Sequence, residues 1–542
     1  MVQYKEYDFR REEIALIKTD IELPIGYGMT DIISALSQKL TLLPGEAESA
    51  ELQKRSLILS DKNNIRYKAT VSLSLDPERE RRLLLARKLV SRFASEPLVI
   101  PESRLTARPL VVGAGPAGLF AALTLALAGA KPIVIERGED VVRRALSVCA
   151  YSSGGVLDPE SNIQFGEGGA GAFSDGKLKV GSKDKYKEFI LQSLVDLGAP
   201  EEILYSTTAH VGTDKLPAAV KSLREKIISL GGEVYFGTKL TEILMENGRT
   251  IGAKAIREGR EELFETDTLI LATGHSARDT VKYLHSLGVP MEARGFGIGV
   301  RIEHPREYIN RLVYGDNYPV GIETASYHLV THLPNGRSVY SFCMCPGGTV
   351  VAASSDRGSI VTNGMSAYAR DADNSNAALL VSVTPEDFPT EGPLGGIILQ
   401  EKLERLAYEA AGSAKAPATR LDAFLEHRHS TAFTDTKPSY PIGTSDISPD
   451  SVLPDYITDS LRIGIADFDE WLPGFGYPSA VLTAPETRTT SPVRILRGAD
   501  YSVPGFSGLY PIGEGAGYAG GIISSARDGV VVAESILRSR YT

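Results

Sequence analysis

The sequence predicts an α/β protein: a doubly wound parallel sheet with a β-meander, an inserted β-rich cap domain and a small α+β domain at the N-terminus. Three observations lead to this fold class. From residue 106 onward, buried strands alternate with glycine turns and helices, which is typical of a parallel sheet. Residues 231–279 resemble a β-meander that returns to a buried strand. Residues 286–480 interrupt the pattern with short alternating strands.

The composition is that of a soluble globular protein with more than one domain. The chain has 542 residues, 42% of them hydrophobic and 23% charged, so two or three domains with ample core are expected. No apolar run is long enough to span a bilayer, and the first residues, MVQYKEYDFRREE, lack the apolar core of a signal peptide. We therefore expect no membrane partner and a cytoplasmic location.

Charge and cysteine content argue against two broad classes of protein. The formal net charge of −10 disfavours wrapping nucleic acid, so a nucleic-acid partner is not expected. Only three cysteines occur in the chain, which opposes a disulfide framework and fits a reducing compartment. The eight histidines show no metal-ligand spacing near the cysteines, so no metal site is expected.

The change of pattern along the chain divides it into four segments. Residues 1–105 form the expected N-terminal domain, and residues 106–285 the first part of a nucleotide-binding domain. Residues 286–480 form the cap, and residues 481–542 return to close the nucleotide-binding domain. The sequence carries no signal for an oligomeric state.

The N-terminal segment has its own strands and helices. The expected elements are strands at 13–18, 56–60 and 68–76, a helix at 29–40 and an arginine-rich helix at 76–93. Thr30 is the expected N-cap of the first helix. Two interpretations of the second helix stay open: a basic face that binds a polyanion or a partner, or an ordinary solvated face.

The stretch RPLVVGAGPAGLFAALTLALAGAKPIVIERG (108–138) predicts a dinucleotide site. A buried strand leads into Gly113, Gly115 and Gly118, and an Ala/Leu-rich helix follows at once. These glycines allow a tight turn, close approach of a pyrophosphate and close helix packing. A second strand ends on Glu136, at the interval from which an acid accepts hydrogen bonds from a ribose.

Two distant segments favour FAD over a nicotinamide cofactor. The buried strand TLILATG ends on Thr273 and Gly274, where it can lie against the cofactor. Near the C-terminus, a strand is followed by a glycine turn that contains Glu514 and then by a helix from about Gly521. An acid at this turn can accept from ribityl hydroxyls, and a helix N-terminus offers N–H groups to the flavin.

Five further motifs make the relationship to a known family more specific. They are SNIQFGEGGAGAFSDGKL, GFGIGVRIEHP, SFCMCPGGTVVAASSDRGSIVTNGMS, ETRTTSPVRI and GLYPIGEGAGYAGGIISSARDG. Together with the glycine turn they resemble a family of uncharacterised bacterial FAD-dependent dehydrogenases, within the glutathione-reductase-like FAD-binding superfamily. The resemblance covers most of residues 50–542 and implies an FAD-dependent oxidoreductase. It leaves the substrate open.

The resemblance also implies that residues 166–178 form a second glycine loop along the flavin. Ser174 and Lys177 would then donate to the cofactor or to a substrate anion, although a solvated surface turn is the alternative. Glu514 stands where the superfamily generally has aspartate. The expected cofactor contacts are Gly113, Gly115, Gly118, Glu136, Arg137, Gly168, Gly169, Ser174, Lys177, Leu240, Thr273, Gly274, Gly513, Glu514, Gly520, Gly521 and Ile522.

Candidate catalytic residues come from the cap. Arg301 is a candidate for binding an anionic substrate group, with an ion pair to Glu303 as the structural alternative. His304 titrates near neutral pH and is a candidate proton carrier, with a hydrogen-bonded structural histidine as the alternative. Arg488 and Arg494 serve either phosphate or substrate binding or structural pairing.

Cys343 and Cys345 lie two residues apart before a Pro-Gly-Gly turn. On a regular strand their side chains share one face, a geometry in which a disulfide is strained. They are therefore expected either to pack in the cap core or to face the flavin in a redox role.

Three functions remain open from the sequence. The first is an FAD-dependent oxidoreductase that moves a hydride between flavin N5 and a small organic substrate. NAD(P)H or another electron donor or acceptor is the expected partner, docking without a dedicated domain, because no second GxGxxG motif has the required context. The second is an FAD-dependent RNA-modifying enzyme that binds RNA through its N-terminal domain. The third is a non-catalytic flavin redox sensor.

Overall fold

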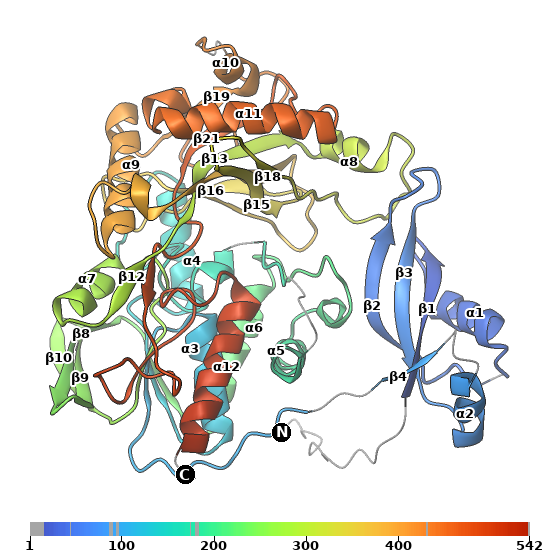
Figure 1. Cartoon of the computed structure of the whole chain (residues 1–542), viewed down its shortest axis with the longest axis horizontal. Helices are drawn as coiled ribbons and strands as arrows, with labels where there is room; N and C mark the ends of the chain where they lie inside the picture. The colour runs from blue at the N-terminus through green and yellow to red at the C-terminus, as the bar shows by residue number, and fades with distance from the viewer. Residues whose placement is uncertain are drawn as a thin grey trace.

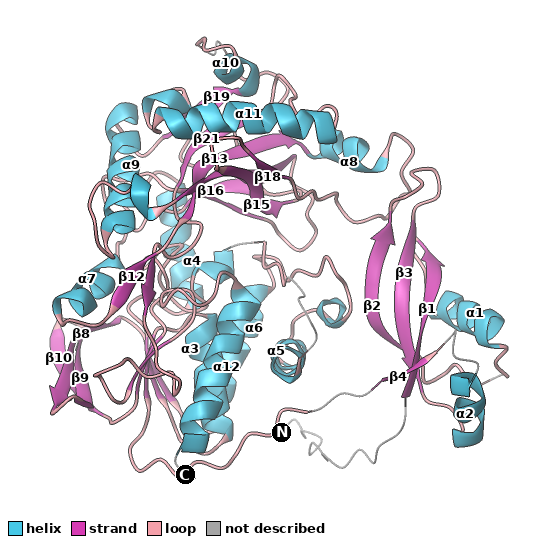
Figure 2. Cartoon of the chain, in the orientation of Figure 1, coloured by secondary structure: helices cyan, strands magenta, loops and turns pink. Residues whose placement is uncertain are grey.

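The fold, shown in Figure 1, has a parallel sheet at its centre, a cap above it and an N-terminal unit at one side. The computed structural model describes residues 16–43, 45–85, 90–93, 97–173, 175–178, 184–429 and 432–539. Helices and strands alternate through the central part, whereas the N-terminal unit is mainly sheet (Figure 2). The predicted fold class is confirmed.

The N-terminal unit is a four-stranded antiparallel sheet in the order β2-β3-β1-β4. The strands are β1 (Leu16–Pro24), β2 (Glu51–Ile58), β3 (Arg66–Leu73) and β4 (Ser91–Phe93), and the helices are α1 (Met29–Leu40) and α2 (Pro77–Leu85). The N-cap of α1 is Gly28, not Thr30, because the chain already turns into the helix at Met29. Of the predicted helix at 76–93, residues 77–85 are helical, residues 86–89 lie outside the described residues, and residues 91–93 pair with β1 instead.

The central sheet is parallel and has five strands in the order β23-β11-β5-β6-β7. The strands are β5 (Leu110–Val112), β6 (Ile133–Ile135), β7 (Glu233–Tyr235), β11 (Leu269–Leu271) and β23 (Leu509–Pro511). Because β23 comes from the C-terminus and pairs beside β11, the end of the chain completes the sheet that β5 begins. The meander β8 (Thr238–Glu246), β9 (Arg249–Arg257) and β10 (Arg260–Glu265) is a separate antiparallel sheet.

Helices pack beside the central sheet, as Figure 1 shows for α3, α6 and α12. The helices of this part are α3 (Pro116–Leu127), α4 (Val141–Ser152), α5 (Lys185–Asp196), α6 (Leu216–Ser229), α7 (Arg278–Ser286) and α12 (Ile522–Ser539). Helix α3 is buried from Ala117 to Ala126, which explains its nearly uniform Ala/Leu composition. Its glycine turn is thereby held at the carboxyl end of β5.

The cap is a seven-stranded sheet in the order β14-β15-β18-β13-β21-β19-β20, with α9 and α11 on its outer side (Figure 1). Its strands are β13 (Phe296–Pro305), β14 (Val330–His332), β15 (Ser338–Cys345), β18 (Asn374–Val383), β19 (Ala416–Arg420), β20 (Thr444–Asp446) and β21 (Val481–Glu486), and its helices are α8 (Arg306–Tyr314), α9 (Gly395–Ala411), α10 (Leu421–Leu425) and α11 (Asp455–Trp471). The cap boundary expected at residue 480 is wrong, since β21 pairs with β13 and β19.

Two short antiparallel ribbons complete the fold. The strands β16 (Thr349–Ala352) and β17 (Thr362–Met365) pair with each other, and so do β12 (Met291–Ala293) and β22 (Val493–Ile495). The second ribbon lies where the chain enters and leaves the cap. Across the described parts of the chain, no helix combines the length and apolarity needed to cross a membrane.

Candidate functional site

One pocket of about 750 Å³ is lined by residues from the central sheet, the meander, the C-terminal helix and the cap. That volume is in the usual range for small-molecule and cofactor sites, about 300–1,000 Å³. The sequence-predicted residues that line it are Gly113, Gly115, Glu136, Arg137, Gly169, Lys177, Leu240, Thr273, Gly274, Cys343, Cys345, Arg488, Glu514, Gly520, Gly521 and Ile522. Arg488 is also paired with the buried Glu404 at 2.8 Å. Segments more than 400 residues apart in the sequence, such as the turns at Gly113 and Gly521, therefore meet at one site.

The glycine turn after β5 has two separate functions. Gly113 has φ +108°, and a Cβ built there would lie 2.3 Å from the carbonyl oxygen of Ala272, so only glycine fits. Gly118 does not line the pocket; a Cβ there would lie 1.9 Å from the Gly113 carbonyl oxygen, so it serves helix packing. Gly115 has ordinary backbone angles, and its missing side chain leaves room in the pocket itself.

Glu136 is buried at the end of β6, where its carboxylate holds three backbone groups. Oε2 accepts from the N–H of Ala114 at 2.8 Å. Oε1 accepts from the N–H groups of Gly138 at 2.9 Å and Gly166 at 3.0 Å. A carboxylate has about four lone-pair positions, so Oε2 retains one acceptor position for a ligand hydroxyl. Glu136 can therefore hold the surrounding backbone and still make the predicted contact with a ribose.

A charged network borders the same end of the pocket. Arg137 makes a bidentate pair with Asp279 at 3.0 and 2.7 Å and donates to Glu160 at 2.6 Å. Lys239 lies 2.8 Å from both carboxylates. These cations lower the pKa of Asp279 despite its burial, so the network stays ionised. Arg137 therefore reaches the pocket with its guanidinium already oriented.

Arg144 was missed by the sequence reasoning, yet it shapes the second glycine loop. Its side chain is fully buried and donates to the carbonyls of Asn162, Ile163, Gly166 and Glu167 at 2.6–3.2 Å. Burial lowers the pKa of Arg144 to about 10, which still leaves it charged at neutral pH. In the sequence, Asp140 marks the start of the helix that contains Arg144, but no signal there indicates the loop that Arg144 holds.

The loop itself packs directly on the dinucleotide turn. The N–H of Gly168 donates to the Ala114 carbonyl at 2.8 Å, so Gly168 supports the turn and does not line the pocket. Gly169 does line it, and a Cβ there would lie 3.1 Å from Cα of Gly115. The backbone of both glycine motifs thus forms one surface. Ser174 lies outside the described residues.

Glu514 lies in the turn before α12 and faces the pocket. Burial raises its pKa to about 7. Its carboxylate lies 3.7 Å from Nδ1 of His275, whose own pKa is lowered to about 3 by burial and by the nearby Arg488 and Arg278 guanidiniums. The contact therefore joins an acid to a neutral imidazole. Within the described residues no donor satisfies this carboxylate, which suits it to accept from ligand hydroxyls.

The start of α12 closes the pocket. Gly520, Gly521 and Ile522 line it, whereas Gly513 does not; its N–H donates to Asp528 at 2.7 Å, and Gly513 has φ +72°. The side chain of Ile522 lies against the second glycine loop, where a Cβ at Gly171 would be 2.9 Å from it. The loop and the helix start therefore form one narrow wall.

Lys177 connects the second glycine loop to the cap. Its ammonium donates to the carbonyl of Met344 in β15 and lies 3.9 Å from Asp175. Asp175 is in turn paired with Arg370, whose Nε lies 3.0 Å from it. Burial lowers the pKa of Lys177. Lys177 stays a predicted hydrogen-bond donor, and its acceptor can be either the cofactor or a substrate.

Cys343 and Cys345 lie on an irregular strand, contrary to the expected period of two. The pairing of β15 with β18 shifts between Phe342 and Cys345, and Cys343 has φ +37°, an unusual value for a residue with a side chain. Cys343 is accessible from the pocket, whereas Cys345 is buried. Both sulfurs are free thiols, and burial raises the pKa of Cys343 to about 12.

Arg301 and Glu486 form a buried pair beneath these cysteines. Arg301 is inaccessible and does not line the pocket; its guanidinium donates to Asn376 and to the Cys343 carbonyl at 2.6 and 2.9 Å. Its carboxylate partner is Glu486 at 3.4 Å and not Glu303, as the alternative had it. Arg301 therefore supports β15 and does not bind a substrate anion directly.

Glu486 was missed by the sequence reasoning. It ends β21, lines the pocket and accepts from Thr362 at 3.4 Å. Burial raises its pKa to about 7, which places its proton exchange near neutral pH. It is the first residue of the motif ETRTTSPVRI, for which the prediction rested on the two arginines and not on the acid.

His304 is not part of the site. Its Nε2 lies 2.8 Å from the Phe475 carbonyl, its ring stacks on Tyr308, and it does not line the pocket. Burial lowers its pKa to about 4. The candidate role as a proton carrier is therefore wrong, and the structural alternative holds.

These features fit an elongated dinucleotide cofactor. The open faces of Gly115 and Gly169, the free lone pair of Glu136 and the unsatisfied carboxylate of Glu514 lie along one pocket. Such an arrangement can accept hydroxyl groups at two places and take a phosphate against backbone N–H groups in between.

Comparisons with known proteins agree with this assignment. Residues 108–300 match the family described as pyridine nucleotide-disulphide oxidoreductase, and residues 295–489 match the one described as FAD-dependent protein, C-terminal domain-like. An uncharacterized protein of Clostridium beijerinckii is 44% identical over 533 residues, which is 97% of this chain and 99% of that protein.

Solved structures with detectable similarity include two dehydrogenases. The 3-ketosteroid-delta4-(5alpha)-dehydrogenase from Rhodococcus jostii is 15% identical, with a TM-score of 0.35 over 82% of this chain and all of that one (100%). An L-proline dehydrogenase from P. horikoshii is 13% identical, with a TM-score of 0.33 over 81% of this chain and 94% of that one.

Proposed function

Because this chain belongs to an uncharacterised family of FAD-dependent oxidoreductases, we propose that it transfers a hydride between flavin N5 and a small organic substrate held under the cap. FAD, when bound, supplies the two-electron chemistry. The residues of this chain would bind it, orient the substrate and manage the proton.

One observation carries the proposal. The pocket that contains Gly115, Glu136 and Glu514 continues without interruption to Lys177 and Glu486 beneath the cap. A cofactor held by the first group would therefore share a cavity with polar side chains that the cofactor-binding fold alone does not require. This arrangement supports an enzyme over a purely structural flavin.

The side chains under the cap suit a polar substrate. Lys177 offers a cationic donor, and Asn363 and Arg370 line the same end of the pocket. Lys177 is held in place by Met344 and Asp175, so it can orient a carbonyl or carboxylate without a large entropic cost. The Cys343 thiol stays protonated at neutral pH and contributes bulk and polarizability.

Glu486 is the candidate proton carrier. Its pKa of about 7 lets it exist in either protonation state near neutral pH, as general acid–base catalysis requires. Its pair with Arg301 fixes the orientation of the carboxyl group. A proton could then leave or join the substrate as the hydride moves.

Anaerobic bleaching of the flavin tests this function. The FAD-loaded protein is mixed with a panel of polar metabolites and with NADH and NADPH, and loss of the oxidised flavin absorbance is followed. We expect at least one compound to bleach the flavin, and Glu486→Gln to slow that reaction while FAD content stays unchanged. A flavin that no small reductant or acceptor can reach would support the redox-sensor alternative instead.

A further inference from the structure

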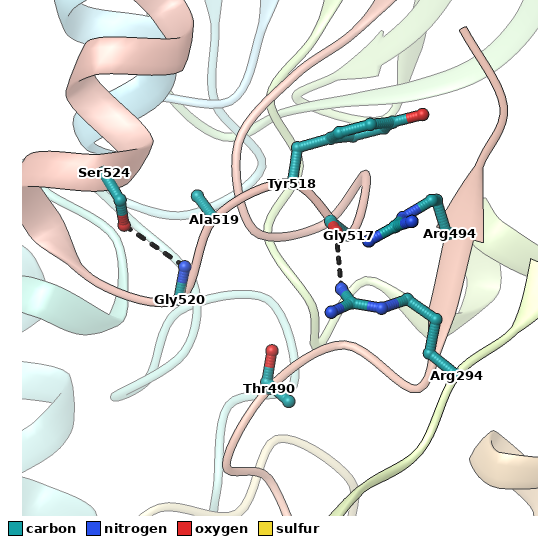
Figure 3. Close-up of a pocket in the computed structure, with 8 residues that line it drawn as sticks. All are labelled: Arg294, Thr490, Arg494, Gly517, Tyr518, Ala519, Gly520 and Ser524. Atoms are coloured by element: carbon teal, nitrogen blue, oxygen red, sulfur yellow. Dashed lines mark hydrogen bonds between the residues drawn. The ribbon is translucent and has the colours of Figure 1, made fainter.

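A second cavity, of about 350 Å³, lies beside the flavin pocket, and two arginine side chains meet at it (Figure 3). Arg294 and Arg494 approach it from one side, and Ser524 and Gly520 at the start of α12 lie across from them. Thr490 and Tyr518 also line it. Arg294, Arg494, Thr490 and Tyr518 take no part in the cofactor contacts described above, whereas Gly520 and Ser524 also line the flavin pocket.

The ribbon of β12 and β22 brings the two arginines together. Arg494 is the middle residue of β22 and lies opposite Glu292, and Arg294 directly follows β12. The N–H of Arg294 donates to the Pro492 carbonyl at 2.8 Å, which fixes its backbone beside the other strand. The positions of the two guanidiniums are therefore built into the fold.

The positive charge of this pair is only partly compensated. Among the described residues, Arg494 has one carboxylate at ion-pair distance, the half-exposed Glu292 at 3.4 Å. Its Nε is buried and donates to no acceptor among the residues that the structure describes. Arg294 donates to the Gly517 carbonyl, and in the described parts of the chain no carboxylate lies at ion-pair distance from it. Burial and the neighbouring Arg494 lower the pKa of Arg294.

A third arginine nearby has a mostly buried carboxylate partner, although its Nε, like that of Arg494, has no acceptor among the described residues. Arg497 lies over the Tyr518 ring, 3.6 Å from its centroid, and pairs with Asp528 at 3.0 Å. Arg294 and Arg494 repel each other and share one partly exposed carboxylate, so an anion in the cavity would relieve this repulsion. The described residues around the cavity therefore leave part of its positive charge without a negative partner.

We propose that Arg294 and Arg494 form a binding subsite for a phosphate group. Guanidinium groups match phosphate oxygens in geometry and charge, and two of them can bind one phosphate from two sides. Thr490 and Ser524 add hydroxyl groups to the same cavity. The partly exposed Tyr518 adds an aromatic side chain to the same cavity.

The subsite adjoins the flavin pocket. Gly520 and Ser524 line both this cavity and the flavin pocket, so a ligand whose phosphate lies between the arginines extends toward the cofactor. In this respect the inference rests on the proposed function: the ligand is a phosphate-bearing redox partner of the flavin. Two sources share this chemistry, a pyridine dinucleotide and a phosphorylated small substrate.

Calorimetric titration of the FAD-loaded protein with inorganic pyrophosphate tests the subsite without relying on turnover. Bound FAD keeps the probe out of the cofactor site. We expect the wild type to bind pyrophosphate, and Arg294→Met and Arg494→Met each to weaken binding by about tenfold or more. Arg82→Met, which removes an exposed arginine from α2 in the N-terminal unit, serves as the matched control and should change nothing.

Wild-type protein that takes up no pyrophosphate would overturn the proposal, and so would unchanged binding in the double arginine variant. Unaltered FAD content and circular dichroism in the variants exclude misfolding as the cause of lost binding. Competition then identifies the source: pyrophosphate displaced by NADH or NADPH assigns a dinucleotide to the subsite. Pyrophosphate that stays bound assigns the phosphate of another redox partner. Both results concern phosphate binding alone, so the subsite and hydride transfer are tested independently.

Discussion

Glu514 and Glu486 are two acids whose charge depends on the pocket around them. Burial raises the pKa of each from 4.5 to about 7. In the folded apoprotein both acids therefore hold a proton more tightly than in the unfolded chain. It follows that the contribution of these two acids to stability is greatest below pH 4.5 and falls as the pH rises toward 7, by up to about 3 kcal/mol for each acid.

The first prediction concerns Glu514→Gln. We expect this variant of the apoprotein to lose the contribution of Glu514 to the pH dependence of unfolding between pH 4.5 and 7, so that raising the pH over this range destabilises it less than the wild type. Urea unfolding at several pH values measures it. An identical pH dependence in variant and wild type would show that Glu514 is not titrating in this window.

The second prediction concerns thiol reactivity. Cys343 is accessible from the pocket but has a pKa raised to about 12, so almost none of it is thiolate at neutral pH. We expect iodoacetamide to alkylate the exposed Cys149 well before Cys343, as followed by peptide mass spectrometry. Alkylation of Cys343 first would indicate a reactive thiolate and favour the redox role.

Single residues show how much of the site can be predicted from local sequence. Gly113, Gly115 and Glu136 were predicted from one short stretch, because the spacing of strand, glycine turn, helix and terminal acid is itself a local pattern. The bulge at Cys343 was not predictable, since it depends on the register between β15 and β18. The failure at His304 has the same cause: its hydrogen-bond partner is the distant Phe475.

The second glycine loop is the element on which the cofactor wall depends most. Arg144 from α4 holds four carbonyl groups of residues 162–167, and a Cβ at Gly166 would lie 2.4 Å from its side chain. Removing the guanidinium leaves these buried acceptors without donors. The loop would then lose the conformation that places Gly169 against Gly115.

The third prediction follows from that dependence. We expect Arg144→Met to lower the free energy of unfolding by at least about 3 kcal/mol and to reduce FAD retention. Its neighbour Arg143 is 77% exposed and serves as the matched control, because Arg143→Met removes an arginine from the same helix without breaking the loop contacts. Thermal unfolding and flavin content of both variants decide the matter; equal effects would contradict this role for Arg144.

Elements with a strong local pattern were predicted well, and those with tertiary pairing less so. The helix at 29–40 is confirmed with the same bounds, as its apolar spacing required. The arginine-rich helix was predicted too long because residues 91–93 gain hydrogen bonds from β1, which a local pattern does not reveal. The cap boundary failed for the same reason at β21.

On the scale of the whole molecule, the N-terminal unit contacts the wall of the pocket. The N–H of Arg55 in β2 donates to the Tyr205 carbonyl at 2.7 Å, and the N–H of Thr207 donates to the Arg55 carbonyl at 2.9 Å. Thr207 also lines the flavin pocket. Arg55 pairs with Glu202 as well, so its charge is already engaged. No sequence motif predicted this contact, because it joins segments about 150 residues apart.

The strand order β23-β11-β5-β6-β7 agrees with the predicted return of the C-terminus to the nucleotide-binding domain. That prediction succeeded because each strand carries its own glycine or acid at its carboxyl end, and parallel strands align those ends at one edge. The substrate side of the pocket had no comparable signal. Many of its residues come from β15, β17 and β21, and these strands meet only through the packing of the cap.

FAD binding by wild type and Gly115→Leu tests the central claim most directly. Gly115 has φ −79°, which a leucine backbone adopts without strain, so the added side chain fills the cofactor cavity and leaves the fold intact. Calorimetry should show one FAD bound per wild-type chain and binding at least about 100-fold weaker in the variant. A wild type that binds no FAD, or a variant that binds it equally well, would contradict the account.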